Sequence, residues 1–108
     1  MQGVKYDGEK PRWDLLPMEE VEEVVKVLTF GAKKYSDDNW MLVKPFRKRY
    51  FAALMRHIVD RYFRGERLDP QSGLPHLAHA GCNLFFLMWH DRQENIGHKT
   101  HKVGQKGE

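Results

Sequence analysis

The sequence indicates helices in three separate stretches of this chain. In the first, residues 18–35, apolar side chains return every three or four residues, on the stripe formed by Val21, Val24, Val25, Leu28, Ala32 and Tyr35. Glutamates lie near the beginning of this stretch and lysines lie near its end, which is the arrangement that the helix dipole favours. The second stretch, 46–64, keeps one apolar side and is followed by Gly65, a natural C-terminal cap. A third helix is expected at 75–94.

These stretches predict an all-α fold with a single domain, residues 1–96. Glycine, proline and alternating charge without a helical period predict that residues 1–17 form an extended arm. Residues 97–108 are polar and rich in lysine, so we expect a disordered basic tail. Because a chain of 108 residues has only a modest core, we expect the helical bundle to be completed by oligomerisation.

The composition excludes some classes of protein. The longest apolar run, 84–89, is too short to cross a membrane. Cys82 is the single cysteine and cannot form an internal disulfide, so we expect a protein of a reducing cytoplasm. We expect Cys82 itself to be a small packed residue. The net charge of +3 favours a nucleotide or phosphate partner over long nucleic acid.

Two imidazoles and an amide follow a turn at the start of the third helix. His76, His79 and Asn83 fall within an arc of about 60° on one helix face. Histidine can change charge near neutral pH, contact a phosphate or bind a metal. The row of histidines is therefore a candidate site.

The second helix carries its own polar stripe. Arg49, Arg56 and Asp60 fall within an arc of about 40°, and His57 lies on its flank. Facing the histidine row, the stripe would suit phosphate oxygens, with Asp60 orienting an imidazole or holding a metal. The alternative is an Arg56–Asp60 pair within the helix, beside histidines that only close a buried hydrogen-bond network.

Two further questions stay open at this point. His76 and His79, three residues apart, suit manganese, iron or zinc together with nearby carboxylates, but no zinc motif is present. Trp13 and Trp40 each suit either stacking on a base or packing in a core.

Several segments resemble a phage family, the N-terminal domain of dATP/dGTP diphosphohydrolases. The most specific are the arm segment 5–17 (KYDGEKPRWDLLP) and the helix start 75–80 (PHLAHA). The resemblance implies a fold similar to the all-α MazG-like nucleoside triphosphate pyrophosphohydrolases. It further implies dimers or larger oligomers and cleavage between the α and β phosphates with Mg²⁺ or Mn²⁺.

The MazG-like pattern places its metals on Glu-x-x-Glu and Glu-x-x-Asp of paired helices. The matching helices here carry Arg56-His57-x-x-Asp60 and His76-x-x-His79 instead. Glu66 and Asp69 have the right spacing, but Gly65 and Pro70 surround them, so we expect both carboxylates on a loop.

The leading hypothesis is a phage-type protein that binds a purine nucleotide and hydrolyses its phosphoanhydride with a divalent metal. The expected nucleotide contacts are Arg56, His57, His76, His79 and Asn83, with Lys5, Lys10, Arg12 and Trp13 of the arm. The expected catalytic residues are Asp60, Glu66 and Asp69, and the expected metal ligands are Asp60, Glu66 and His79. The alternative is a non-catalytic phage sponge that sequesters a nucleotide signal of host immunity. Either protein would work in the host cytoplasm.

Overall fold

The part of the chain that the structure describes folds into helices. The computed structural model describes the backbone of residues 3–101 and the side chains of residues 3–97. The elements are η1 (Trp13–Leu15), α1 (Met18–Lys34), η2 (Asn39–Leu42), α2 (Phe46–Met55), the π-helix η3 (Arg56–Tyr62) and α3 (His76–His101). Over these residues there is no strand, only an isolated antiparallel bridge between Leu68 and Pro75. The predicted all-α class is confirmed.

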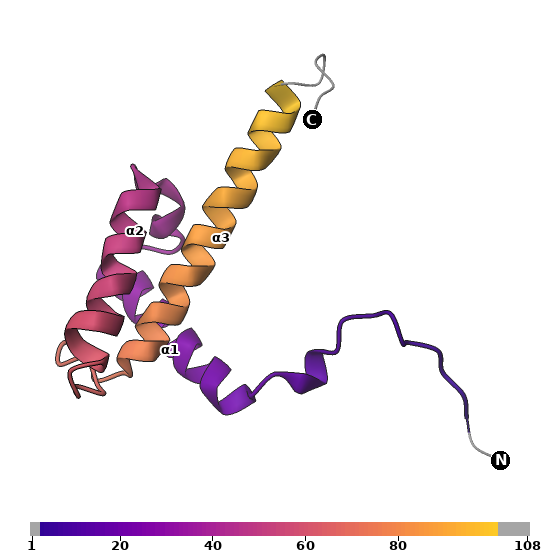
Figure 1. Cartoon of the computed structure of the whole chain (residues 1–108), viewed down its shortest axis with the longest axis horizontal. Helices are drawn as coiled ribbons and strands as arrows, with labels where there is room; N and C mark the ends of the chain where they lie inside the picture. Colours follow the sequence, from indigo (N-terminus) through magenta and orange to yellow (C-terminus); the bar gives the residue numbers. More distant parts are fainter. Residues whose placement is uncertain (1–2, 102–108) are drawn as a thin grey trace.

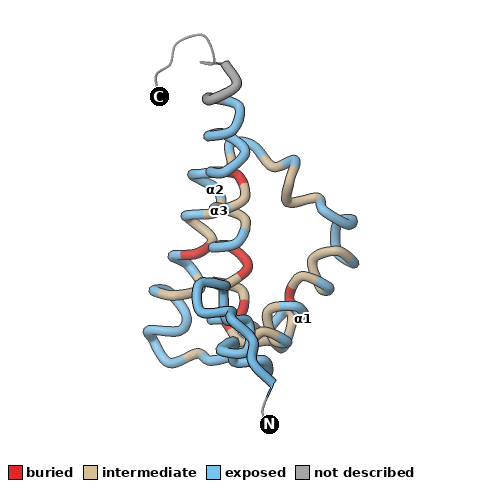
Figure 2. Tube along the Cα trace, turned by 90° about the vertical axis from the view of Figure 1, so that its right-hand side faces the viewer, coloured by how far each residue is buried: buried red, intermediate tan, exposed pale blue. Residues whose placement is uncertain are grey.

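The long helix α3 is the central element (Figure 1). Both α1 and α2 pack against α3, and α1 diverges from the α2–α3 pair (Figure 2). The buried positions lie mostly along α3, where the other helices cross it. Helix α3 therefore carries most of the buried residues of the described chain.

Helix α1 begins and ends almost where the sequence predicts. Pro17 precedes its first turn, and the N–H of Tyr35 bonds to the carbonyl of Gly31 at 2.9 Å and closes the last turn. The predicted apolar stripe is only partly buried. Val25 and Tyr35 are exposed, whereas Val27, outside the stripe, is buried. The core-facing side of α1 is therefore rotated from the predicted one.

Small residues on α3 let α1 approach closely. Val27 packs with Ala78 and Cys82 to form the buried core. A Cβ atom added to Gly81 would lie 3.2 Å from a methyl carbon of Val24, which is tighter than ordinary contact. The Cys82 thiol donates to the Val24 carbonyl at 3.4 Å, and burial raises the pKa of this thiol to about 12. Cys82 is thus the small packed residue that the sequence predicts.

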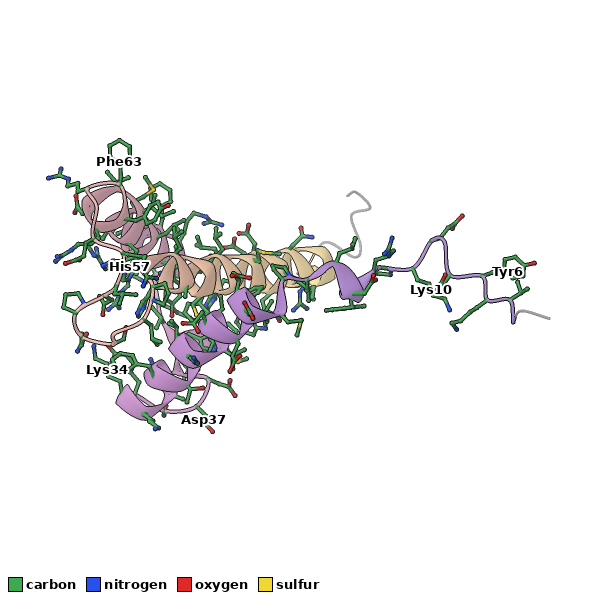
Figure 3. All side chains as sticks on the ribbon, turned by 90° about the horizontal axis from the view of Figure 1, so that it is seen from below. Tyr6, Lys10, Lys34, Asp37, His57 and Phe63 are labelled. Atoms are coloured by element: carbon green, nitrogen blue, oxygen red, sulfur yellow. The ribbon has the colours of Figure 1, made fainter. Side chains whose placement is uncertain are left out.

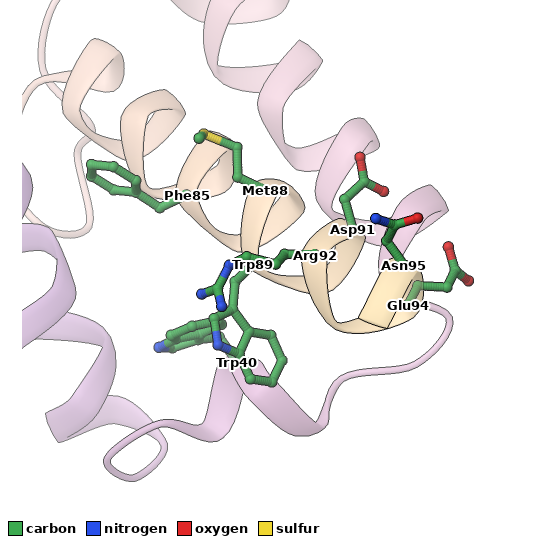
Figure 4. A pocket seen from close by; sticks show the side chains of 8 residues that line it. All are labelled: Trp40, Phe85, Met88, Trp89, Asp91, Arg92, Glu94 and Asn95. Carbon is green, nitrogen blue, oxygen red and sulfur yellow. The ribbon is translucent and has the colours of Figure 1, made fainter. Parts of the chain in front are cut away.

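Trp40 fastens the crossover between α1 and α2 onto α3. Its ring stacks on Phe86 with centroids 4.7 Å apart. Its carbonyl accepts hydrogen bonds from the hydroxyl of Tyr50 at 3.0 Å and from Nε2 of His90 at 2.9 Å. Of the two roles open for Trp40, the packing role is the one that the structure displays. Trp40 also borders a surface pocket with Phe85, Met88, Trp89, Asp91, Arg92, Glu94 and Asn95 (Figure 4).

The two ends of the chain differ from each other. The arm is exposed from residue 3 onward, contains the short helix η1 and projects away from the helices (Figure 1). Helix α3 continues past its predicted end near Glu94 to His101, because one glycine, Gly97, weakens a helix by only about 1 kcal/mol. The first part of the predicted disordered tail is therefore helical, and residues 102–108 lie outside the described residues.

The chain is more extended than a compact domain of its length. Its radius of gyration is 18.2 Å, whereas about 13 Å is typical of a compact chain of this size. No helix within the described residues combines the length and apolar character needed to span a membrane.

Candidate functional site

Three histidines meet where η3 ends and α3 begins. The Nδ1 atoms of His57 and His76 are 2.8 Å apart. The ring of His79 stacks on the ring of His57 with centroids 4.6 Å apart and planes 12° from parallel. His76 is 1% exposed, while His57 and His79 are partly buried. The side chains of His57, His76 and His79 therefore form one contiguous group, the histidine cluster.

Glu66 lies on the loop beside this cluster. Its Oε1 accepts a hydrogen bond from Nε2 of His76 at 2.8 Å and also contacts the guanidinium of Arg61 at 3.3 Å. Because a carboxylate only accepts, a neutral His76 carries its proton on Nε2 and leaves a lone pair on Nδ1. His57 then donates its own Nδ1–H to that lone pair.

Asp69 and Ser72 form the turn that holds His79. Oδ2 of Asp69 accepts the backbone N–H groups of Gln71 at 3.1 Å and Ser72 at 2.9 Å. The Ser72 hydroxyl accepts the N–H of Leu74 and lies 2.7 Å from Nε2 of His79. A positive φ of 73° at Gly73 closes the turn, a conformation that favours glycine. Glu66 and Asp69 are thus on a loop, as predicted.

The helix that carries His57 changes its hydrogen-bond pattern at Arg56. Within η3 and after it, N–H groups bond five residues back, from Phe63 to Ile58 at 2.8 Å and from Glu66 to Arg61 at 2.9 Å. A π-helix has more residues per turn than an α-helix, and such turns are frequent at functional sites. His57 is the second residue of this π-helix and meets His76 and His79 of α3.

The surroundings keep His57 and His79 neutral. Burial lowers the pKa of His57 to about 4, with further contributions from His79 and His76. Burial also lowers the pKa of His79, although Asp69 opposes the shift. For Asp69 itself, burial acts to raise the pKa, but the N–H of Ser72 and the neighbouring imidazoles outweigh it and lower the pKa. At neutral pH the imidazoles of His57 and His79 are thus uncharged and lie beside the ionised carboxylate of Asp69.

The structure brings together most of the predicted site residues and separates others. Glu66 and Asp69 join the histidine cluster, and the amide of Asn83 donates to the carbonyl of His79 at 3.0 Å. Asp60 is exposed and does not join them, so it has no geometric support as a ligand or a base. The possible ligand atoms of His57, Asp69 and His76 lie within 4.8 Å of one another. This set differs from the predicted metal ligands, which are Asp60, Glu66 and His79.

The predicted contacts in the arm are not at this site. Lys5, Lys10 and Trp13 are exposed, and Figure 3 shows Lys10 far from His57. Arg12 pairs with Asp14 at 2.7 Å on the arm itself. Within one copy of the chain, the arm and the histidine cluster are therefore separate.

A cleft of about 1260 Å³ opens beside the cluster, between α1, the crossover and α2. His57, Asp69, His79 and Asn83 border it. The wall formed by α2 and the first residue of η3, called the α2 wall from here on, carries Lys48, Arg49 and Arg56 and no acidic residue, and α1 adds Lys34. Aromatic side chains also line it, namely Phe30, Tyr35, Trp40, Tyr50 and Phe86. The cleft thus offers cationic, aromatic and imidazole groups to one ligand.

Sequence reasoning missed Ser72, whose hydroxyl contacts His79. The sequence Ser72-Gly73 before a helix is a turn signal, and that signal points to a serine that bonds to nearby groups. Of the aromatic residues that line the cleft, only Trp40 was considered as a partner for a base, and the π-helix was missed, because both features depend on how the helices pack.

Comparisons with known proteins agree with one another. The family profile described as dATP/dGTP diphosphohydrolase, N-terminal, matches residues 1–99. A protein of Salmonella phage PMBT28 named dATP/dGTP diphosphohydrolase is 35% identical over 89 residues, which cover 82% of this chain. Those residues are 30% of the phage protein, so the chain spans less than a third of that relative's length. No solved structure matches. Both names describe a hydrolase, and neither favours the sponge.

Proposed function

The chain belongs to the dATP/dGTP diphosphohydrolase N-terminal family, and from this premise we propose that it binds a purine deoxynucleoside triphosphate in the cleft and takes part in its hydrolysis. The reaction adds one water to the anhydride between the α and β phosphates and releases a deoxynucleoside monophosphate and pyrophosphate. The observation that carries the proposal is one cleft that joins a cationic wall to the histidine cluster.

The phosphates belong on the α2 wall in this proposal. A neutral imidazole adds no positive charge, so the charge that attracts phosphate has to come from Lys48, Arg49 and Arg56. The acidic residues at the crossover, Asp37 and Asp38, lie elsewhere along the cleft. This arrangement orients a nucleotide with its phosphates toward α2 and its base toward Phe30 and Tyr35 at the end of α1.

The residues at the cluster do not fit Mg²⁺. Magnesium takes oxygen ligands in an octahedron, whereas the convergent donors here are two imidazoles and one carboxylate. Asp69 is an ionised carboxylate that borders the cleft, and we assign it the role nearest the reacting groups, while Glu66 holds His76 behind it. Asp60 has no such role.

The direct test is to incubate the purified chain with dGTP and with dATP, in separate reactions containing Mg²⁺, Mn²⁺ or Zn²⁺. We expect a monophosphate and pyrophosphate by chromatography, and binding of dGTP by calorimetry. Deoxypyrimidine triphosphates are the control for base preference. Tight binding with recovery of intact purine triphosphate in every reaction would contradict the hydrolytic part.

Arg56→Gln is expected to weaken dGTP binding about 10- to 100-fold, because a charge-assisted hydrogen bond contributes about 1.5–3 kcal/mol. Arg64→Gln is the matched control, since Arg64 is an exposed arginine that does not border the cleft. Calorimetry measures the dissociation constant of dGTP for each variant and for wild type. Equal affinities for dGTP would exclude Arg56 as a phosphate contact.

The proposal includes a homo-oligomer. The exposed residues Leu77, Leu84 and Met88 of α3 lie within an arc of about 40° on the helix. Packing of this stripe against a second copy would bury apolar surface that the extended chain leaves in water.

Leu84→Glu is expected to shift the molar mass measured by light scattering toward the monomer, since it places a charge in the apolar stripe. Gln93→Glu is the control, because it adds the same charge at an exposed position of α3 outside that stripe, and we expect it to leave the molar mass unchanged. A wild-type chain that is monomeric at high concentration, or an unchanged mass for Leu84→Glu, would rule out this interface.

A further inference from the structure

Three side chains from different parts of the chain converge at the histidine cluster. His57 comes from η3, Asp69 from the loop and His76 from the first turn of α3, and their ligand atoms lie within 4.8 Å of one another. We infer that His57, His76 and Asp69 bind a late first-row transition-metal ion, of which Zn²⁺ is the representative, and that Glu66 positions His76 for it. The inference deepens the proposed function, because the ion would lie at the end of the nucleotide cleft.

Glu66 prepares His76 as a ligand. Its hydrogen bond to Nε2 at 2.8 Å leaves the Nδ1 lone pair of a neutral His76 directed at His57. A carboxylate on the far nitrogen of a histidine ligand is the usual outer partner in zinc sites, where it fixes the tautomer and makes the ring more basic. Since His76 is almost fully buried, this orientation is fixed.

His57 needs only a change of tautomer to become the second ligand. When its proton moves from Nδ1 to Nε2, both Nδ1 atoms present lone pairs to the same point. Two nitrogens bound to one tetrahedral zinc lie about 3.3 Å apart, at zinc–nitrogen distances of about 2.0–2.1 Å. The observed 2.8 Å therefore has to widen by about half an ångström. His57 is partly exposed at the surface of the cleft and can make this shift.

Asp69 supplies the third ligand with its orientation already set. Its Oδ2 accepts hydrogen bonds from the two backbone N–H groups of its own turn. The other oxygen, Oδ1, then offers its lone pairs to the metal ion. His79 stacks on His57 and is held by Ser72, so it lies beside the three ligands and fixes the plane of one of them.

The donor set decides which ion fits. Two imidazoles and one carboxylate suit zinc and its late first-row neighbours, whereas magnesium prefers oxygen donors and keeps several waters. The low pKa values of His57 and Asp69 support the assignment, because metal binding requires neutral imidazole and ionised carboxylate. Three protein ligands leave open coordination positions, as in catalytic zinc sites, where the ion polarises phosphoryl oxygen and activates water.

The test uses the chain without a polyhistidine tag, stripped of metal with a chelator. Titration with Zn²⁺ by calorimetry is expected to give one ion per chain with a dissociation constant of about 1 μM or lower, equivalent to about 8 kcal/mol. Titration with Co²⁺ is expected to give the intense visible absorption of a four- or five-coordinate ion. Excess Mg²⁺ is expected not to displace the Co²⁺.

The decisive variant is Asp69→Asn, since its amide oxygen can still accept the N–H groups of Gln71 and Ser72. We expect its zinc affinity to fall about 100-fold, and that of Glu66→Gln about 10-fold, the range seen for outer partners. His90→Gln is the control, because His90 is buried elsewhere and its amide replacement can still donate to Trp40.

Weak binding of both metals by the wild type would overturn the inference, as would equal zinc affinity in Asp69→Asn and wild type. The two proposals fail separately. Zinc binding with no hydrolysis of any purine triphosphate contradicts only the proposed function. Hydrolysis supported by Mg²⁺ in a chain that does not bind Zn²⁺ or Co²⁺ contradicts only the metal site.

Discussion

Replacing His76 with alanine is expected to lower the free energy of unfolding by about 3 kcal/mol, the largest effect that we expect from any single substitution at the site. The side chain is 1% exposed and bonds at both ring nitrogens, to His57 and to Glu66. Its loss leaves a cavity and removes a partner from two polar groups, one of them charged. Urea unfolding, followed by circular dichroism at pH 7.5, measures the difference.

The matched control is Leu77→Ala, one residue further along the same helix. Leu77 is 48% exposed, so its truncation is expected to cost less than about 1 kcal/mol. His76→Gln is expected to recover part of the loss, because an amide can still donate to Glu66. A difference of less than about 1 kcal/mol between wild type and His76→Ala would mean that the hydrogen bonds of His76 do not stabilise the fold.

Helix boundaries were predictable wherever local chemistry determines them. The sequence predicts helix α1 over residues 18–35 from its glutamates, its lysines and its apolar spacing. The observed helix ends at Lys34, one residue earlier. Gly65 and Pro70 indicated correctly that Glu66 and Asp69 lie on a loop. These signals act within a few residues of the chain, and a single sequence contains them.

The composition of the site was not predictable to the same degree. The projection at 100° per residue describes α2 as far as Met55, but the π-helix that follows turns less per residue. Arg56 lines the cleft together with Arg49, as the predicted stripe implies, whereas Asp60, four residues further on, is exposed and does not border the cleft. Such a change in pitch depends on tertiary packing, for which the sequence holds no local signal.

The burial of the histidines changes the role that we expect for them. The sequence predicts His57, His76 and His79 as nucleotide contacts, and His79 also as a metal ligand. An imidazole binds phosphate most strongly when it is positively charged. Burial lowers the pKa of His57 and of His79, so both are poor partners for phosphate at neutral pH and good ligands for a metal. Charge for the phosphates then falls to arginine and lysine on the α2 wall.

Acidification from pH 7 to pH 4.5 is expected to destabilise the chain, because His57 is neutral when folded. Its pKa is about 4 in the fold and 6.5 ordinarily, so the unfolded chain binds more protons between these values. The stability contributed by neutral His57 is complete above about pH 6.5 and is lost as the pH falls toward 4. The lowered pKa of His79 acts in the same direction.

The size of this effect follows from the burial of the ring. The full pKa difference of His57 corresponds to about 3 kcal/mol, and because the ring is partly exposed to water we expect roughly half of that. Urea unfolding at half-unit steps of pH measures it in the metal-free chain. His57→Gln cannot titrate, so its stability is expected to change less with pH over the same range. An equal pH dependence in His57→Gln and wild type would assign the acid sensitivity to other groups and remove the electrostatic reason for regarding His57 as a neutral ligand.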